Sequence, residues 1–368
     1  MKSHEGYPGI SSAPRELDIC LTGKCNLKCR YCFYAESMEK AQDLPAADWL
    51  ALFREAGSIG VQKVCLSGGE VFVRKDLFEI IDSVIENRMR YKILSNGTLI
   101  DEKTISEFSK GKRRPRLDSI QISIDGSKAE IHDKSRPPES FERAITALRL
   151  LKSNGFPVTV RVTINRHNVD DLENIAALLI DDIGLSGFST NEADYMGSAR
   201  CNGQDIILTV DERKRAMAAL IGISEKYGGK IASQAGPLTR ARMMAEITER
   251  LKRGETSMKG RGTLCSCGGV FNKMAVLHNG TYVPCNMLPE LVMGRMGEVS
   301  LRDVWLAHPN INIVRERRRI PITEVEECRG CEYAGFCTGG CPGTVMSKTG
   351  VLNAIDPLVC YKKYLQEV

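Results

Sequence analysis

Short apolar runs alternate with longer stretches in which apolar residues recur every three or four positions over residues 16–235. The runs predict strands at 16–21, 61–67, 91–94, 119–124, 158–164 and, more weakly, 187–191. The longer stretches predict helices at 45–57, 77–87, 140–153, 170–183 and 211–227. Strands that alternate with helices are typical of parallel βαβ units, so we expect an α/β fold with six such units.

The pattern changes toward both ends of the chain. Residues 1–15 are polar with Gly, Ser and Pro and predict a loose arm. A basic helical stretch lies within residues 236–262 and predicts a linker helix. Residues 263–368 show short strands, turns and cysteines instead of long periodic stretches. We therefore expect four parts: 1–15, 16–235, 236–262 and 263–368.

Composition narrows the class of protein. The chain has 368 residues, 42% hydrophobic and 26% charged, as in globular proteins. A net charge of +5 is too small to indicate nucleic-acid binding. No secretory signal and no apolar stretch long enough for a membrane helix is visible, which predicts a cytoplasmic protein. Fourteen cysteines in a reducing compartment indicate metal or cluster ligands and a cell with little oxygen.

Three cysteines directly after the first predicted strand have a CxxxCxxC spacing: Cys25, Cys29 and Cys32. Three thiolates can hold three irons of a four-iron cluster and leave the fourth iron open, whereas electron-carrying clusters usually have four cysteines. A zinc site or a chance spacing is the alternative.

The spacing, its place after a strand, and Tyr31 before the third cysteine resemble the radical S-adenosylmethionine (SAM) family. The resemblance implies a partial (β/α)6 TIM-like barrel with its chemistry at the C-terminal ends of the strands. It also implies that SAM binds the open iron and yields a 5′-deoxyadenosyl radical on reduction. Tyr31 would then lie beside the adenine.

Further positions resemble the cofactor-binding motifs of that family. Gly68-Gly69-Glu70 is similar to its GGE motif, with Glu70 facing the SAM ammonium, although Val71 stands where the family usually has proline. His132 and Arg136 resemble a His-Asp-x-x-Arg stretch, in a structural or substrate-facing role. Serine and asparagine at strand ends are also ordinary turn residues. The other positions that the resemblance assigns to SAM are Ser95, Asn96, Ser123, Asp125 and, for its carboxylate, Arg161.

A second cysteine array, near the C-terminus, resembles the seven-cysteine SPASM domain. The resemblance implies two auxiliary four-iron clusters and so three [4Fe-4S] clusters in total; two zinc knuckles are the alternative. Only one residue separates Cys265 from Cys267, so either both bind auxiliary cluster I or one does and an iron stays open. The expected ligands are Cys265, Cys267, Cys285 and Cys341 for cluster I, and Cys328, Cys331, Cys337 and Cys360 for cluster II.

Three cysteines lie outside these motifs. Cys20 and Cys65 fall within predicted strands, where cysteine behaves as a small buried hydrophobe. Cys201 falls in a polar loop beyond the sixth strand. It is either a hydrogen-atom donor to a substrate radical or a loop cysteine without a role.

The SPASM resemblance implies a peptide or protein maturase that cross-links, epimerises or oxidises a residue of a ribosomally made substrate. Asn286 stands where sulfatase-activating relatives carry an aspartate base, which disfavours oxidation to formylglycine. A radical enzyme for a small molecule, such as a tetrapyrrole side chain or an amino sugar, and a non-catalytic iron–sulfur or zinc scaffold are the alternatives.

The expected partners follow from this hypothesis. A flavodoxin- or ferredoxin-type protein would supply electrons. Only 24 residues precede Cys25, so we expect leader recognition by a separate protein, or directly by the barrel and basic surfaces of the chain. The expected basic surface is the run Arg315, Arg317, Arg318 and Arg319.

Overall fold

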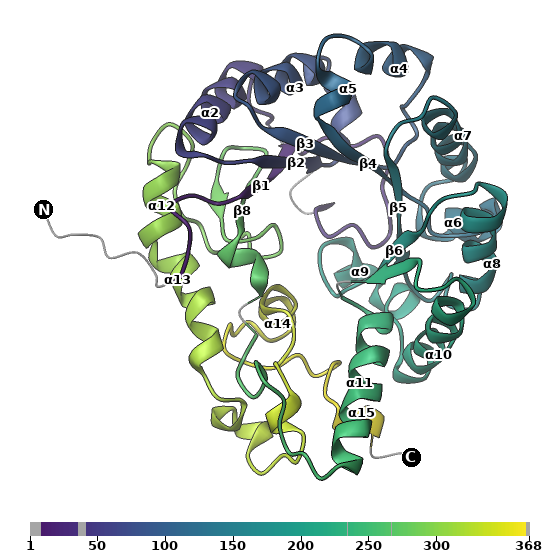
Figure 1. Ribbon diagram of the computed structural model, residues 1–368, viewed down its shortest axis with the longest axis vertical. Helices are drawn as coiled ribbons and strands as arrows, with labels where there is room; N and C mark the ends of the chain where they lie inside the picture. Colours follow the sequence, from purple (N-terminus) through teal and green to yellow (C-terminus); the bar gives the residue numbers. More distant parts are fainter. Residues whose placement is uncertain (1–8, 36–41, 234, 266, 366–368) are drawn as a thin grey trace, which may run out of the picture.

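The computed structural model describes residues 9–35, 42–233, 235–265 and 267–365. A curved sheet runs through the molecule in the order β7-β6-β5-β4-β3-β2-β1-β8-β9 (Figure 1). The strands β1 to β8 are parallel to their neighbours, and β9 is antiparallel to β8. The first seven strands are β1 (Glu16–Thr22), β2 (Lys63–Gly68), β3 (Arg90–Ser95), β4 (Leu117–Ser123), β5 (Val158–Ile164), β6 (Phe188–Glu192) and β7 (Ile231–Ser233).

This sheet confirms the α/β prediction and all six expected strands, and it adds a short parallel strand, β7, beyond β6. The added strand, β7, is only three residues long and has one buried apolar residue, Ile231, so it leaves no alternating pattern in the sequence.

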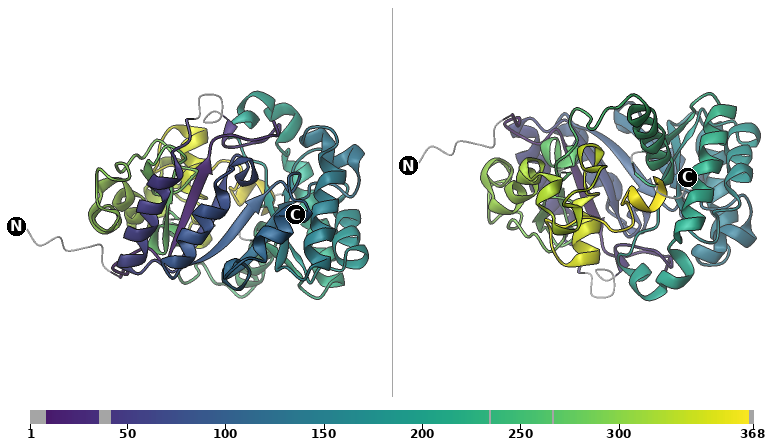
Figure 2. Two further views of the ribbon diagram at one scale, coloured as in Figure 1. Left: turned by 90° about the horizontal axis from the view of Figure 1, so that it is seen from above. Right: turned by 90° about the horizontal axis from the view of Figure 1, so that it is seen from below.

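Most helices of this half lie on the outside of the curved sheet, whereas helix α9 lies on its inner side (Figures 1 and 2). The predicted helix at 170–183 is a short α-helix followed by a π-helical turn, Ala177–Asp182, so its periodicity is not that of one α-helix. The helices of this half are α2 (Ala46–Ile59), α3 (Leu77–Glu86), α4 (Glu102–Phe108), α5 (Arg113–Arg116), α6 (Ala129–Ser135), α7 (Ser140–Ser153), α8 (Leu172–Ala176), α9 (Ser198–Ile206), α10 (Val210–Lys226) and α11 (Pro237–Lys252).

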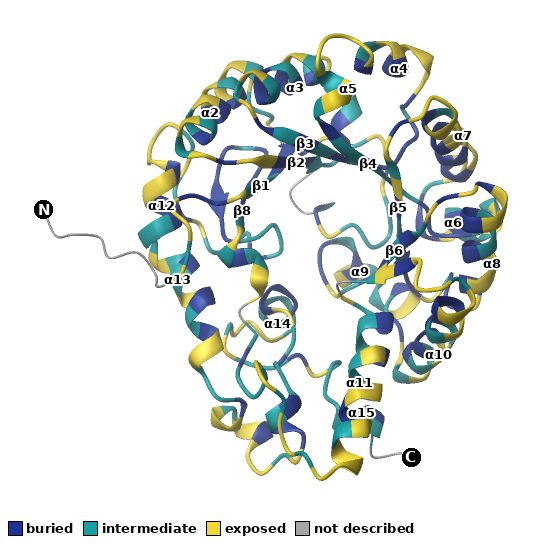
Figure 3. Ribbon diagram, viewed as in Figure 1, coloured by how far each residue is buried: buried dark blue, intermediate teal, exposed yellow. Residues whose placement is uncertain are grey.

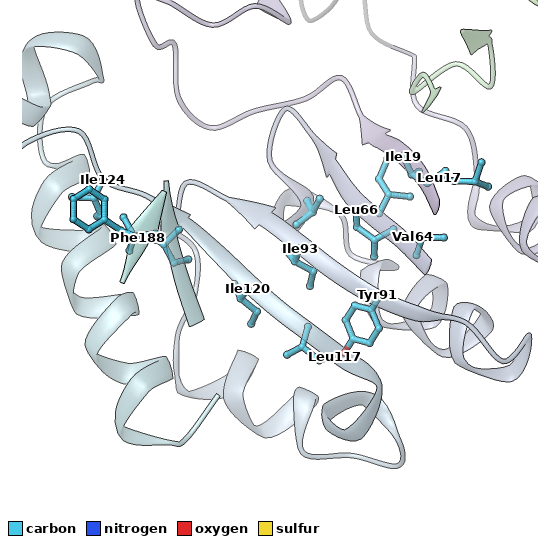
Figure 4. Packing of buried hydrophobic residues seen from close by; sticks show 14 of the residues in the cluster. Leu17, Ile19, Val64, Leu66, Tyr91, Ile93, Leu117, Ile120, Ile124 and Phe188 are labelled. Carbon is cyan, nitrogen blue, oxygen red and sulfur yellow. The ribbon is translucent and has the colours of Figure 1, made fainter. Parts of the chain in front are cut away.

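Strand residues of alternating polarity separate the hydrophobic core from the inside of the curve. Leu17 and Ile19 are fully buried and point to the helix side together with apolar residues of the neighbouring strands (Figure 4). Glu16 and Asp18, which alternate with them on β1, are only partly buried. Burial of such an aliphatic side chain contributes about 1.5–3 kcal/mol. The core therefore lies between sheet and helices, and the inner face stays polar.

The C-terminal half joins the same sheet. Strand β8 (Lys273–Val276) pairs with the first residues of β1, and β9 (Tyr282–Val283) pairs with β8. Beyond them lie α12 (Leu301–Ala307), α13 (Pro309–Glu316), α14 (Pro342–Thr349) and α15 (Lys362–Leu365), with short 3-10 turns between. Exposed residues gather on the outer surfaces of both halves (Figure 3).

No helix in the described part of the chain is both long and apolar enough to cross a membrane.

The expected basic surface at residues 315–319 is wrong in part. Arg315 and Arg317 are fully buried, and the guanidinium of Arg315 lies 4.5 Å from the centre of the Trp305 ring. Arg318 lies over the ring of Phe271, and Arg319 pairs with a glutamate one turn earlier. Arg315 lies in the last turn of α13 and the other three arginines lie in the 3-10 turn after it, so their side chains point in different directions and two of them enter the core.

Candidate active site

The cysteine loop after β1 is held in place by the backbone of Gly68-Gly69-Glu70. The N–H of Gly69 donates to the carbonyl of Thr22 at 2.8 Å, and that of Glu70 donates to the carbonyl of Lys24 at 2.9 Å. A Cβ on Gly69 would lie 2.1 Å from the carbonyl oxygen of Lys24. Glycine is therefore required where the end of β2 touches the start of the cysteine loop.

Glu70 is 1% exposed and joins the end of β2 to the end of β3. Its carboxylate accepts hydrogen bonds from the Ser95 hydroxyl at 2.9 Å, the Asn96 N–H at 2.8 Å and the Phe72 N–H at 3.2 Å. Burial raises the pKa of Glu70, and these hydrogen bonds act in the opposite direction. The structure thus brings together Glu70, Ser95 and Asn96 beside Cys25, as the sequence predicted for one site.

Tyr31, Asp125 and Arg136 form a buried network beside Cys29. The Arg136 Nε donates to Asp125 at 2.6 Å, and its Nη2 donates to the Tyr31 hydroxyl at 2.5 Å. The Tyr31 hydroxyl in turn donates to Asp125, and the Arg136 Nη1 lies 3.9 Å from the Cys29 sulfur. His132 accepts a hydrogen bond from the Asp125 N–H at 3.0 Å, and burial lowers its pKa to about 4.

This network was only partly visible in the sequence. The sequence motif at His132 and Arg136 could be recognised, but nothing in the sequence indicated that Arg136 contacts the cysteine loop. Burial raises the pKa of the Cys29 thiol, and the positive charge of Arg136 acts in the opposite direction.

Ser123 and Arg161 lie on adjacent strands at the same register. The Arg161 Nε donates to the Ser189 hydroxyl at 2.8 Å, and the side chain is only partly buried. Its position on the polar inner face allows it to receive an anionic group.

Helix α9 also contacts the cysteine loop. The Ser198 N–H donates to the carbonyl of Cys32 at 2.9 Å, and the Asn202 side chain donates to the carbonyl of Arg30 at 3.0 Å. Cys201 is exposed on this helix, so the prediction that it lies in a loop is wrong. The sequence of α9 has few apolar residues, of which Ala199 and Ile206 are buried, and contacts with residues far away in the chain stabilise the helix.

The three thiols of the loop lie close enough for their charges to interact, since the charges of Cys29 and Cys32 both contribute to raising the pKa of Cys25. Burial raises the pKa of Cys25 to about 12 and that of Cys32 to about 11. Thiols of this kind become thiolates only when a metal displaces the proton.

The C-terminal cysteines gather into two sets. In one, the charges of Cys267 and Cys341 act on Cys285, and the Cys267 N–H donates to the Cys265 sulfur at 3.2 Å. Cys267 has a positive φ of 49°, a backbone conformation that residues other than glycine rarely adopt. In the other set, the charges of Cys331, Cys337 and Cys360 contribute to raising the pKa of Cys328. The members named here thus lie near one another, and their role as cluster ligands stays a prediction.

The cysteine sulfurs are not already as close together as the ligands of one bound zinc ion. Four thiolates bound to zinc at about 2.3 Å in a tetrahedron would lie about 3.8 Å apart. Among the described residues, no three of the cysteine sulfurs lie within 4.8 Å of one another.

One compact set of possible metal ligands does occur, inside the curve of the sheet. It consists of Glu16, Asp18 and Cys65. Lys92 pairs with Glu16 at 2.6 Å and Lys273 pairs with Asp18 at 2.7 Å, so the two carboxylates are neutralised by lysines. Cys65 and Cys20 are buried, as expected.

Family models match two parts of the chain. One, described as the radical SAM superfamily, matches residues 19–179. The other, SPASM, described as an iron-sulfur cluster-binding domain, matches residues 265–332. The chain therefore contains a radical SAM domain and a SPASM domain. It is thus a radical SAM enzyme that uses SAM and iron–sulfur clusters.

Relatives of this radical SAM enzyme include two proteins named PqqA peptide cyclase. That of Gluconobacter oxydans (strain 621H) is 26% identical over 364 residues, which cover 98% of this chain and 94% of the relative. That of Methylocella silvestris is 26% identical over 346 residues, which cover 93% of this chain and 86% of the relative.

Solved structures share the fold. SuiB of Streptococcus suis bound to its precursor peptide SuiA has a TM-score of 0.72 at 20% identity, over 97% of this chain and 77% of that chain. The anSMEcpe enzyme with bound AdoMet and a peptide has a TM-score of 0.69 at 18% identity, over 95% of this chain and 96% of that chain.

Proposed function

We propose that this enzyme is a radical SAM peptide maturase that acts on a residue of a ribosomally made peptide or protein. The names of the two relatives and their near-complete coverage support a peptide substrate. The reaction class is cross-linking, epimerisation or oxidation. In this proposal residues 16–235 form the radical SAM barrel, 236–262 the linker, and 263–368 the SPASM domain.

The observation that carries the proposal is where the first C-terminal cysteine set lies. The charge of Cys285 acts on Cys20, near the C-terminal end of β1. The charge of Asp194, two residues after β6, acts on Cys341. This set therefore lies by the C-terminal ends of strands at both sides of the barrel, where a substrate can meet both redox sites.

Different residues of the barrel would hold the cluster and SAM. Cys25, Cys29 and Cys32 would hold the barrel cluster, which with SAM supplies a 5′-deoxyadenosyl radical when both are bound. Glu70, held by Ser95 and Asn96, would face the SAM ammonium. The remaining positions proposed to line SAM are Tyr31, Gly68, Gly69, Ser123, Asp125 and Arg161.

The donor set of the C-terminal half favours two fully ligated auxiliary clusters, and so three [4Fe-4S] clusters in all. Cys265 and Cys267 would both bind cluster I with Cys285 and Cys341. Cys328, Cys331, Cys337 and Cys360 would bind cluster II. These clusters would pass electrons to or from a flavodoxin- or ferredoxin-type partner, and a separate protein would recognise a leader peptide.

Asn286 disfavours formylglycine formation within this class. Its Oδ1 is buried without a hydrogen-bond partner among the described residues, and an amide cannot act as a carboxylate base. Cys201 would serve as a hydrogen-atom donor only if the reaction is an epimerisation.

Anaerobic reconstitution and peptide assays test the proposal. The protein would be loaded with iron and sulfide, and iron per chain counted. It would then react with SAM, dithionite and short peptides encoded beside its gene. We expect about twelve irons, 5′-deoxyadenosine, and a peptide that loses two hydrogens or gains deuterium from solvent.

Two variants separate the roles of the cysteine sets. Cys29→Ala should abolish SAM cleavage. Cys341→Ala should keep some cleavage but lose peptide modification. Deoxyadenosine without modification of any such peptide, together with turnover of a small molecule, would refute the peptide substrate.

A further inference from the structure

Arg317 is a fully buried arginine in the 3-10 turn that follows α13. Its Nε donates to the carbonyl of Cys265 at 2.9 Å. Both terminal nitrogens, Nη1 and Nη2, are buried and have no hydrogen-bond partner in the described part of the chain. The only charges that act noticeably on this guanidinium are those of the Cys265 and Cys341 thiols.

A buried cation with unused N–H groups is unfavourable by several kcal/mol unless an anion compensates it. The neighbours of Arg317 are two of the four cysteines proposed for auxiliary cluster I. A four-iron cluster held by thiolates is an anion, and its sulfur atoms accept hydrogen bonds. The unused N–H groups therefore lie where such a cluster would satisfy them.

Arg315, two residues earlier, shows the contrast. It is also fully buried, but its Nε donates to the carbonyl of Val270 at 3.0 Å and its Nη1 to that of Trp305 at 2.9 Å. Its guanidinium also lies 4.5 Å from the centre of the Trp305 ring. Packing and backbone carbonyls thus explain Arg315, and they do not explain the terminal nitrogens of Arg317.

We propose that Arg317 donates N–H hydrogen bonds to sulfur atoms of auxiliary cluster I and thereby raises the reduction potential of that cluster. The inference rests on the proposed auxiliary cluster. A reduced cluster carries one more negative charge than the oxidised cluster, so a fixed cation and hydrogen bonds to sulfur stabilise the reduced form. Arg317 therefore acts on the substrate only through the cluster, by making cluster I a better electron acceptor.

The test is a redox titration of the reconstituted full-length protein, followed by electron paramagnetic resonance. Arg317→Met and Arg317→Gln remove the charge at similar side-chain length. Arg319→Met is the control, because Arg319 is exposed and pairs with Glu316. Iron per chain and the unfolding midpoint are measured first, so that only folded, fully loaded variants are compared.

We expect one cluster signal to move in both Arg317 variants. At the wild-type midpoint potential the ratio of reduced to oxidised cluster should fall at least tenfold. This corresponds to a midpoint potential lower by about 59 mV for a one-electron couple. The other signals and the Arg319 variant should match wild type. Unchanged potentials in a fully loaded Arg317 variant would overturn the inference. A wild-type protein that binds iron for the barrel cluster alone would instead defeat the auxiliary clusters of the proposed function.

Discussion

The buried Asp125–Arg136 pair predicts a large cost when one partner is removed. Asp125 is 0% exposed and Arg136 is 8% exposed. The Asp125 carboxylate accepts from the Arg136 Nε at 2.6 Å, the Thr163 N–H at 2.7 Å and the Tyr31 hydroxyl. Asp125→Asn leaves the guanidinium as an uncompensated buried charge, which costs about 3–5 kcal/mol of unfolding free energy. This is a large fraction of the stability of a typical domain.

A double-mutant cycle measures the pair itself. Arg136→Met should also destabilise the protein, because it leaves the carboxylate unpaired. The double variant Asp125→Asn/Arg136→Met removes both charges, so it should be more stable than the sum of the single effects predicts by about 2 kcal/mol or more. Urea unfolding of all four proteins under anaerobic conditions, with reduced thiols and matched metal content, gives the four free energies.

An exposed pair of the same chemistry is the control. Arg149 and Asp182 lie 3.0 Å apart, with side chains 59% and 58% exposed. Their cycle should give a coupling of about 0–1 kcal/mol. Additive effects at Asp125 and Arg136, or a coupling no larger than that of the exposed pair, would refute the reasoning from burial.

Three further predictions concern stability and cluster loading. His132 has a pKa of about 4 when folded against 6.5 when unfolded, so the unfolded chain binds more protons between these values and stability falls as the pH falls. Urea unfolding should show a loss of about 2 kcal/mol from pH 7 to pH 5 that His132→Gln removes; an equal slope in both proteins would contradict this. Gly69→Ala forces a Cβ against the carbonyl of Lys24, so iron per chain after reconstitution should fall, whereas Gly222→Ala, which meets no atom within 4 Å, should load normally. Lys348→Met leaves two carboxylates without their shared lysine and should lower the unfolding free energy by about 3 kcal/mol, measured in urea; a change below 1 kcal/mol would show that the carboxylates find water.

Local patterns in the sequence were sufficient for much of the fold. Strands β1 to β6 have apolar runs that must be buried, and each is followed by a helical stretch or a turn. The two C-terminal cysteine sets were predicted from the resemblance to the SPASM domain, because members such as Cys285 and Cys341 lie far apart in the chain. The strand and helix patterns depend on residues within one or two turns of each other.

Features that depend on distant contacts could not be predicted. The hydroxyl of Tyr31 meets Asp125 and Arg136, which lie more than ninety residues away. Helix α9 depends on hydrogen bonds to the cysteine loop, so its own sequence resembles a loop. The run that contains Arg317 appeared exposed, because charge alone does not reveal that a residue lies next to buried cysteines.

The shared sheet bears on how the two halves can work together. Residues 16–19 of β1 pair with β2 on one side and with β8 on the other, so both halves are hydrogen-bonded to the same strand. The cysteine loop follows β1 directly, and Cys285 follows β9, the partner of β8. Separating the halves would break a parallel strand pair and expose unpaired backbone groups, which is costly. The distance between the barrel thiols and the first auxiliary set is therefore a property of the sheet. If the proposed clusters are bound, a substrate would reach both of them by entering the barrel, because the β1–β8 pairing opposes movement of one half against the other.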